Sequence, residues 1–268
     1  MKKTFSKVIK KIRNFLDYSV FSESLDMVPK GEQVVINTIN QYSYCIAEHD
    51  EAFKNSLINS DVLLPDGIAI VGAIKLLTGK IVKKIAGWDL HQHLLNDLNE
   101  SKGSCFYLGA SVETLKKIKL RLSIDFPFIK VGNYSPPFKK NFNDADDQKM
   151  IDAVNNFKPD VLFVGMTAPK QEKWVNKYRQ KLHASTICSI GAVFDFYAGI
   201  VQRPNKVLVS FGLEWFGRLI KEPKRMLKRY LYFGPVYIWS IFREKIRTLS
   251  TMNNWVVIYP GFLIPSPV

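Results

Sequence analysis

The sequence predicts an α/β fold, in which a mainly parallel sheet carries helices on both faces. Short apolar runs rich in β-branched and aromatic residues alternate with helical patterns of 10 to 15 residues. This alternation is typical of βα units. The chain has 268 residues, 47% of them hydrophobic, and no internal repeat or low-complexity linker. It is therefore long enough and apolar enough to bury one full core.

The predicted elements follow one another in a regular order. Strands are expected at residues 34–38, 61–64, 104–110, 128–134, 160–166 and 185–191. A helical stretch runs to about Asn59, and later helices are expected at residues 66–79, 88–100, 111–124, 144–157 and 169–182. Gly79 closes the second of these helices, and Pro169 suits the first position of the last.

The formal net charge of +14 is concentrated at the two ends of the chain. Residues 1–30 hold seven Lys and Arg against three acids, and residues 203–247 hold eleven against three. A nearly neutral centre with basic ends is typical of a protein that binds something anionic. The candidates are a membrane surface, a nucleic acid and a phosphorylated substrate.

The chain is predicted to have three parts. Residues 1–30 form a basic amphipathic segment, residues 31–203 the α/β domain, and residues 204–268 a basic, aromatic C-terminal appendage. In the first part, lysines interrupt any signal-peptide core, and the apolar residues have helical spacing. We expect an amphipathic helix there, either at a membrane surface or on the protein surface, built on Phe5, Val8, Ile9, Ile12, Phe15 and Leu16.

Neither a membrane span nor a disulfide is predicted. No run of 18 apolar residues occurs, and about that many are needed to cross a bilayer. The apolar end "WVVIYPGFLIPSPV" is broken by Pro260 and Gly261. Cys45, Cys105 and Cys188 are far apart, odd in number and in apolar surroundings, so they are expected to be reduced core residues.

Polar side chains follow several of the predicted strands. Thr38 and Asn40 come after "VVI", Asp66 after "VLLP", and "APKQE" after the strand at 160–166. Open parallel sheets bind ligands at the carboxyl ends of their strands. Asp66 has two possible roles there: it caps the following helix, or it acts as a general base.

Five motifs in this chain resemble the WecG/TagA/CpsF glycosyltransferase family. They are "LLPDGIAIVGA…GWDL", "FYLGAS", "PDVLFVGMTAPKQEKWV", "SIGAVFDFYAGIVQRP" and "GLEWFGRLIKEPKRMLKRY", and the resemblance covers roughly residues 34 to 232. It implies a Rossmann-like domain, with residues 31–203 as the catalytic part and an appendage behind it. Members transfer a hexose-type sugar, often N-acetylmannosamine or its uronate, from a UDP-sugar to a polyprenyl-diphosphate-linked sugar. Such steps build teichoic-acid linkage units, enterobacterial common antigen, capsules and exopolysaccharides.

The resemblance also assigns roles to single residues. Asp66 matches the carboxylate proposed as the catalytic base of an inverting transfer. Thr38 and Asn40 match a T-x-N motif near the substrate, and Gln171 matches a glutamine that contacts the sugar. Asp195 either contacts the same pocket or is a buried structural residue.

Charge on the leaving diphosphate is expected to be neutralised by cations of the protein rather than by a metal. Lys84 stands where the family often has arginine, so it would act as a point charge. The "DAD" string at 144–146 opens a predicted helix, where acids complement the helix dipole, and it is not expected to bind metal. No cofactor is predicted. The appendage supplies the other cations: Arg218, Arg225, Lys228 and Arg229.

The expected partners are a UDP-sugar donor, a lipid-diphosphate-linked sugar acceptor and an anionic membrane surface. The donor sugar is left open between N-acetylmannosamine, a uronate, glucose and galactose. A cytoplasmic protein, peripheral on the inner face of the membrane, would meet such an acceptor. Aromatic residues of the appendage are expected to anchor it in lipid: Tyr230, Tyr232, Phe233, Tyr237, Trp239 and Phe242.

Other function classes fit less well. A nucleic-acid-binding protein would also be basic, but no RNA- or DNA-binding motif appears in the sequence. A nicotinamide oxidoreductase would share the fold class, but no G-x-G-x-x-G follows any predicted strand. A catalytically inactive member of the family is disfavoured by the presence of Asp66 and Gln171. Assembly into a homo-oligomer is left open.

Overall fold

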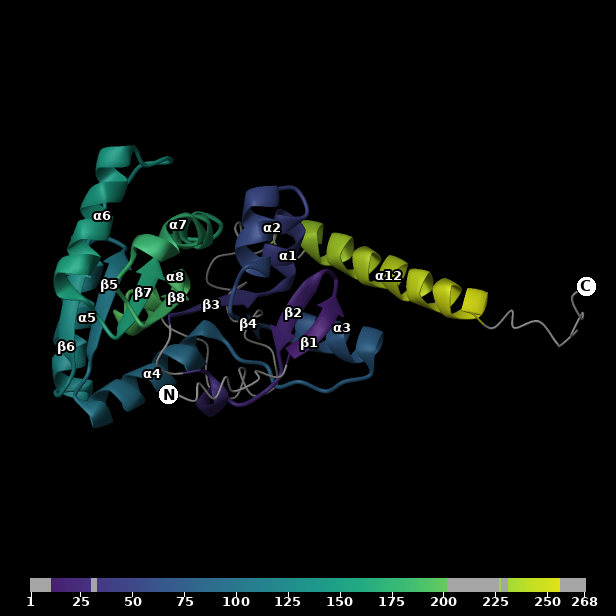
Figure 1. Cartoon of the computed structure of the whole chain (residues 1–268), viewed down its shortest axis with the longest axis horizontal. Helices are drawn as coiled ribbons and strands as arrows, with labels where there is room; N and C mark the ends of the chain where they lie inside the picture. The colour runs from purple at the N-terminus through teal and green to yellow at the C-terminus, as the bar shows by residue number, and fades with distance from the viewer. Residues whose placement is uncertain (1–10, 30–32, 202–226, 228–230, 256–268) are drawn as a thin grey trace, which may run out of the picture.

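A computed structural model describes residues 11–29, 33–201, 227 and 231–255 of the chain. Its centre is a six-stranded, entirely parallel sheet with the strand order β4-β3-β8-β7-β5-β6 (Figure 1). The strands are β3 (Val34–Ile39), β4 (Val62–Pro65), β5 (Ser104–Gly109), β6 (Lys130–Tyr134), β7 (Val161–Gly165) and β8 (Thr186–Ser189). The predicted α/β fold class is confirmed.

Helices cover both faces of this sheet. Val34 and Ile36 of β3 point into one cluster with residues of α4 (Gly87–Ser101), α5 (Val112–Asp125) and α8 (Gly191–Tyr197). Val35, the residue between them, points to the other face, which α6 (Asp144–Phe157) and α7 (Lys170–Tyr178) cover. Because side chains alternate along a strand, each later residue of β3 can be assigned to a face in the same way.

A second group of helices packs beyond β3 and β4. It comprises α1 (Gln41–Ala47), α2 (Glu51–Ile58) and α3 (Ile68–Thr78), and its core is continuous with that of the C-terminal helix α12 (Phe233–Trp255). Two one-turn helices complete the elements, at Leu25–Met27 and Arg179–Lys181. Gly79 closes α3 in the left-handed conformation, as predicted, whereas Pro169 is the N-cap residue of α7 rather than its first residue.

The helix predicted near the N-terminus is wrong for residues 11–21, which form an antiparallel hairpin. Its strands are β1 (Lys11–Phe15) and β2 (Tyr18–Phe21), joined by Leu16 and Asp17 with φ of 49° and 70°. The register shifts between Ile12 and Phe15, which lets two residues three apart point into the same core. Apolar residues three apart are also typical of an amphipathic helix, which explains why the sequence predicted one. Residues 1–10 of the predicted helix lie outside the described residues.

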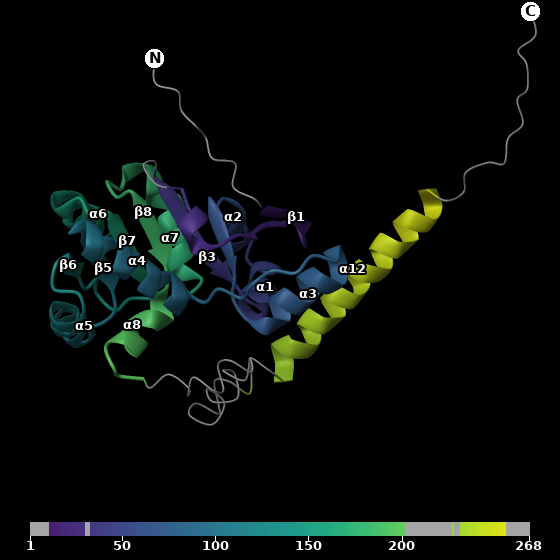
Figure 2. The ribbon, with the colours of Figure 1, turned by 90° about the horizontal axis from the view of Figure 1, so that it is seen from below.

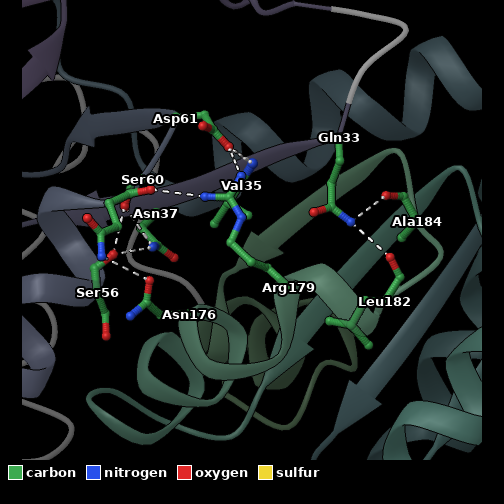
Figure 3. Close-up of polar contacts among 11 residues, drawn as sticks. Gln33, Val35, Asn37, Ser56, Ser60, Asp61, Asn176, Arg179, Leu182 and Ala184 are labelled. Carbon is green, nitrogen blue, oxygen red and sulfur yellow. Dashed lines mark hydrogen bonds and ion pairs between the residues drawn. The ribbon is translucent and has the colours of Figure 1, made fainter.

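Side-chain hydrogen bonds connect the amino-terminal ends of the strands, as Figure 3 shows. Asp61 accepts hydrogen bonds from the Val35 amide at 2.8 Å and from Arg179 Nη2 at 2.5 Å. Gln33 Nε2 donates to the carbonyl of Leu182 at 2.8 Å. These contacts tie β3 to the segments that enter β4 and β8. Contacts within the protein thus occupy the amino-terminal ends of the strands. The residues predicted to bind substrate lie at the carboxyl-terminal ends.

Helix α12 packs on the domain by one face and leaves the other exposed. Tyr237 is buried, donates a hydrogen bond from its hydroxyl to the Ala69 carbonyl at 3.3 Å, and stacks edge-on with Tyr44. Phe233 is half-buried against Tyr42. Both residues were expected to anchor in lipid, and that prediction is wrong for Tyr237 because its ring lies in the protein core. Further along, α12 projects away from the body of the molecule (Figures 1 and 2).

Two further observations concern the predicted absence of spans and disulfides. All three cysteines are buried and unbridged, which confirms their assignment to the core. Across the described ranges, none of the helices combines the length and the apolar character needed to pass through a bilayer.

Candidate active site

The carboxyl ends of β3 and β4 bring four of the predicted residues into one region. Thr38 lies opposite Leu64 in the parallel register of these strands, and the Asp66 amide donates to the Ile39 carbonyl at 2.9 Å. The segment that returns from α3 also reaches this edge, because the Ile85 amide donates to the Pro65 carbonyl at 3.0 Å. Thr38, Asn40, Asp66 and Lys84 therefore converge at one end of the sheet, as open parallel sheets lead us to expect.

Asp66 lies between β4 and α3, one residue before the helix N-cap. The N-cap itself is Gly67, which adopts φ of 102° and carries no side chain. The cap position proposed as an alternative for Asp66 is therefore occupied by another residue. A non-glycine residue would be strained at that φ, so the glycine allows the chain to turn sharply out of the strand. The carboxylate is thereby placed next to the positive end of the α3 dipole.

Asn40 uses its side-chain oxygen to hold α1. Its Oδ1 accepts hydrogen bonds from the Tyr42 and Ser43 amides at 3.1 and 3.0 Å, and Ser43 Oγ accepts from the Asn40 amide at 2.8 Å. This is a capping box. Asn40 can offer a bound sugar its amide N–H groups, while its oxygen fixes where the helix begins. Thr38 continues the alternation of Val34 and Ile36 and belongs to the α4 and α8 face of the sheet.

Gln171 is buried, with 5% of its side chain exposed. Its Oε1 accepts from the Met166 amide at 3.2 Å, and its Nε2 donates to Glu172 Oε1 at 2.9 Å. A Cβ placed on Gly191, the first residue of α8, would lie only 2.5 Å from Gln171 Oε1. Gln171 therefore joins the start of α7, the end of β7 and the start of α8, and its amide has little room to turn.

Lys170, the neighbour of Gln171, points away from this region. Its Nζ donates to the Lys139 carbonyl and lies 3.5 Å from the centre of the Phe142 ring. Of the two polar residues that begin α7, only Gln171 lies against the start of α8.

A model of the family described as "Glycosyl transferase WecG/TagA/CpsF family" matches residues 11–251. The chain belongs to the WecG/TagA/CpsF family of glycosyltransferases. The match spans the parallel sheet, the strand ends just described and α12 as far as residue 251. The resemblance drawn from the five sequence motifs is confirmed.

Named relatives cover most of this glycosyltransferase. A Bacillus subtilis (strain 168) protein named N-acetylglucosaminyldiphosphoundecaprenol N-acetyl-beta-D-mannosaminyltransferase is 31% identical over 211 residues, 79% of this chain and 80% of the relative. A protein of the same name from Bacillus spizizenii is 30% identical over 199 residues, 74% of this chain and 75% of the relative. One from Staphylococcus aureus (strain MW2) is 24% identical over 210 residues, 78% and 80% of the two chains.

Asp195, a further predicted residue of this glycosyltransferase, lies on α8 and is half-buried. Its backbone carbonyl accepts from the amides of Ile200 and Val201 at 3.0 and 3.2 Å, which closes the end of the helix. The predicted cations of the appendage, Arg218, Arg225, Lys228 and Arg229, lie outside the described residues.

Glu172 is a buried carboxyl to which the sequence analysis gave no role. Only 4% of its side chain is exposed, and burial raises its pKa from 4.5 to about 7, although the hydrogen bond from Gln171 opposes the change. Its Oε2 has no hydrogen-bond partner among the residues that the structure describes. The sequence held one signal of its burial: Glu172 precedes the apolar Val175 by three positions, so both lie on the inward face of α7.

Ionisation of Glu172 should make the folded glycosyltransferase less stable as the pH rises. The pKa of this carboxyl is about 7 in the fold and ordinarily 4.5, so the unfolded chain loses the proton at lower pH than the folded protein. The free energy of unfolding should then fall by about 3 kcal/mol across that interval and stay low above it. Glu172→Gln cannot ionise and should be more stable than the wild type at about pH 8, but not at about pH 4.

Urea denaturation of both proteins at the two pH values measures this difference directly. Comparing the variant with the wild type cancels the titration of all other groups. A stability difference that is the same at both pH values would show that Glu172 does not titrate as its burial implies.

The acidic string at the start of α6 serves the fold. Asp146 forms a capping box with Asn143 and an ion pair with Lys139 at 2.8 Å. Asp147 is buried and accepts hydrogen bonds from Trp174 Nε1 at 2.9 Å and from the Tyr178 hydroxyl at 2.6 Å. Within the described part of the chain, no group of three or more His, Cys, Asp or Glu side chains is arranged to hold a metal ion.

EDTA is expected to leave the rate of sugar transfer within about twofold of its value without chelator, if cations of the protein neutralise the leaving diphosphate as the sequence predicts. The measurement is product formation with and without EDTA after the enzyme has been dialysed against it. Loss of activity that Mn²⁺ or Mg²⁺ restores would contradict this prediction. Asp144→Asn and Asp146→Asn would then show whether α6 supplies ligands.

Proposed function

We propose that this glycosyltransferase moves N-acetylmannosamine from UDP-N-acetylmannosamine to the N-acetylglucosamine of an undecaprenyl-diphosphate-linked acceptor. The observation that carries the proposal is the 31% identity, over 79% of the chain, to a relative whose name states this transfer. The aligned share is large enough to include the sheet and its carboxyl edge. The nucleotide part of the donor rests on the family resemblance of the strand-end motifs.

In the proposed reaction Asp66 is the general base. Its carboxylate takes the proton of the acceptor hydroxyl as that oxygen attacks the anomeric carbon of the donor. A new C–O bond forms on one face of the sugar, the bond to the diphosphate breaks on the opposite face, and UDP leaves with the electron pair. The configuration at the anomeric carbon is therefore inverted.

The remaining residues at this edge bind and orient the substrates. Thr38, the amide N–H groups of Asn40 and the amide of Gln171 are proposed to hold sugar hydroxyls. Lys84, on the segment that hydrogen-bonds to the end of β4, is proposed to offer a point charge to the diphosphate. Arg218, Arg225, Lys228 and Arg229 are proposed to supply the rest of the positive charge.

A lipid-linked acceptor keeps its tail in the bilayer, so the enzyme must come to the membrane surface. We propose that it does so as a peripheral protein on the cytoplasmic face, through α12. The exposed side of this helix combines apolar residues with the cations Arg243 and Arg247, a composition that suits an anionic interface. The exposed apolar residues are Val236, Ile238, Trp239, Phe242, Ile246 and Leu249.

Incubation with a panel of UDP-sugars and an undecaprenyl-diphosphate-N-acetylglucosamine analogue tests the substrates. Mass spectrometry of the lipid product should show the addition of one N-acetylhexosamine from UDP-N-acetylmannosamine. Preferred transfer from UDP-glucose, UDP-galactose or a UDP-uronate would show that the proposed donor is wrong, while the proposed type of reaction would stand. Absence of product from every donor would refute the proposed function.

A further inference from the structure

A buried polar layer lies above the apolar core between the sheet and α7. Val35 of β3 and Ile187 of β8 are partners in the parallel register and pack with Val175 of α7. Two residues further along these strands, Asn37 and Ser189 point to the same face, because side chains alternate. Glu172 is buried three residues before Val175, so it lies on the side of α7 that packs on this face of the sheet.

Each of the three residues in this layer has a polar atom without a partner. The atoms are Glu172 Oε2, Asn37 Oδ1 and Ser189 Oγ, and none has a hydrogen-bond partner in the part of the chain that the structure describes. These residues are 4%, 1% and 2% exposed. The other end of the Asn37 amide is occupied, since Nδ2 donates to Ser60 Oγ at 2.8 Å (Figure 3). A buried polar atom without a partner is costly.

A proton on Glu172 would convert its unpartnered acceptor into a donor. Glu172 Oε1 accepts from Gln171, so a proton on the carboxyl group would be carried by Oε2. An ionised carboxylate would instead leave Oε2 as a buried acceptor without a hydrogen-bond partner among the described residues.

We propose that Glu172 is the positioning residue that fixes the amide of Gln171 for contact with the donor or acceptor sugar. The inference rests on the proposed function, because it is there that Gln171 binds sugar. Gln171 Oε1 is held by the Met166 amide and confined by Gly191. Only Nε2 remains to be oriented, and Glu172 Oε1 orients it.

Burial, rather than a nearby charge, raises the pKa of Glu172. Burial is the main cause of the raised pKa of Glu172, and hydrogen bonds from Gln171 and from the backbone oppose it. Lys173 is paired with Asp50 at 2.8 Å, and Lys177 lies 3.8 Å from Asp147. The titratable and charged groups on α7 and on the elements packed against it are Asp50, Glu51, Lys54, Asp144, Asp146, Asp147, Lys149, Asp152, Lys170, Lys173, Lys177, Tyr178, Arg179, Lys181, Cys188 and Asp195.

Substitutions at position 172 separate positioning from packing. Glu172→Gln reproduces the neutral acid, with an oxygen toward Gln171 and an N–H donor toward the layer, and should keep kcat/KM within about threefold of wild type. Glu172→Met keeps the volume but cannot accept the hydrogen bond from Gln171. It should lower kcat/KM at least about tenfold, mainly by raising KM for the sugar substrate that Gln171 contacts. Glu100→Met, at an exposed site on α4, is the matched control and should behave as wild type.

A double-mutant cycle tests whether Glu172 acts through Gln171. Once Gln171→Ala has removed the amide, adding Glu172→Met should cause no further loss of kcat/KM. If Glu172 had a purely structural role, Glu172→Met would lower kcat/KM by the same factor with or without Gln171→Ala. Additive losses, or a Glu172→Met enzyme with wild-type KM for donor and acceptor, would overturn the proposal.

A measurement on the amide itself does not depend on activity. In ¹⁵N-labelled protein, the side-chain N–H protons of Gln171 should exchange slowly with water in the wild type and in Glu172→Gln, and quickly in Glu172→Met. Equal exchange in all three proteins would overturn the positioning role even if no sugar were transferred. Lack of transfer by a wild type with a protected amide would refute the proposed function alone.

Discussion

Asp66→Asn is expected to lower the turnover of sugar transfer by about 10²- to 10⁴-fold, the usual contribution of a general base. Asparagine has nearly the same shape as aspartate but cannot accept the proton of the attacking hydroxyl. The fold should be unaffected, because the N-cap of α3 is Gly67 and the backbone amide of residue 66 keeps its bond to Ile39. The measurements are kcat with saturating substrates and the affinity for UDP, which should change little.

Asp144→Asn is a matched control for this variant. Asp144 also lies at the beginning of a helix, but it is exposed on α6, away from the ends of β3 and β4. Its substitution should leave turnover unchanged. An Asp66→Asn enzyme within about threefold of wild type would show that Asp66 is not the base.

The second large effect is expected from the exposed face of α12. Replacing Ile238, Trp239 and Phe242 with glutamine should weaken binding to vesicles of phosphatidylglycerol by about 10²-fold, since each side chain contributes about 1 kcal/mol or more on entering the interface. These three side chains are 68%, 64% and 56% exposed, so the core should be unaffected. Glutamine also retains high helix propensity. Vesicle co-sedimentation measures the binding.

Two comparisons make this result specific. Glutamine at Leu120, Ile124 and Phe128, which are equally exposed on and after α5, should leave vesicle binding unchanged. The helix α5 lies at the far end of the molecule from α12 in Figures 1 and 2. Tyr237→Ala should instead destabilise the fold by about 3 kcal/mol or more, because its ring is buried. Equal loss of binding in the α5 and α12 variants would contradict a docking role for α12.

The parallel sheet could be predicted because its signals are local. Every residue of β7 is buried on both faces, so the strand is a continuous apolar run in the sequence. Helix α6 has the predicted bounds of Asp144–Phe157 because Asn143 caps its start and Lys158 ends it in the left-handed conformation. The first and last residues of such elements can be predicted from the neighbouring sequence.

The hairpin could not be predicted in this way, because its register depends on the core it packs against. Leu16 and Asp17 occupy left-handed conformations without the glycine or asparagine that usually indicates such a turn. The irregular register between Ile12 and Phe15 also hides the alternation expected of a strand. Both features become visible only when β1 and β2 are seen beside α1 and α3.

At the candidate site, the sequence predicted residues at the strand ends, but it did not predict the contacts that hold them. Asp66 and Gln171 were predicted from motifs at strand ends. The role proposed for Glu172 depends on its burial on the inward side of α7, which becomes visible only when α7 is seen packed on the sheet. The sequence also did not show which face of α12 is buried. Tyr237 and Trp239 are both aromatic and only two residues apart, yet Tyr237 is buried and Trp239 is exposed.

The central claim is that a single displacement, with Asp66 as base, transfers the sugar. The anomeric configuration of the new glycosidic bond tests it most directly. With an α-linked UDP-N-acetylmannosamine donor labelled with ¹³C at C1, the one-bond C1–H1 coupling of the product distinguishes the two configurations. We expect a β-linked product, formed by Asp66→Asn at least about 10² times more slowly than by the wild type under the same conditions. An α-linked product would require two displacements, or a different mechanism, and would contradict the role assigned to Asp66.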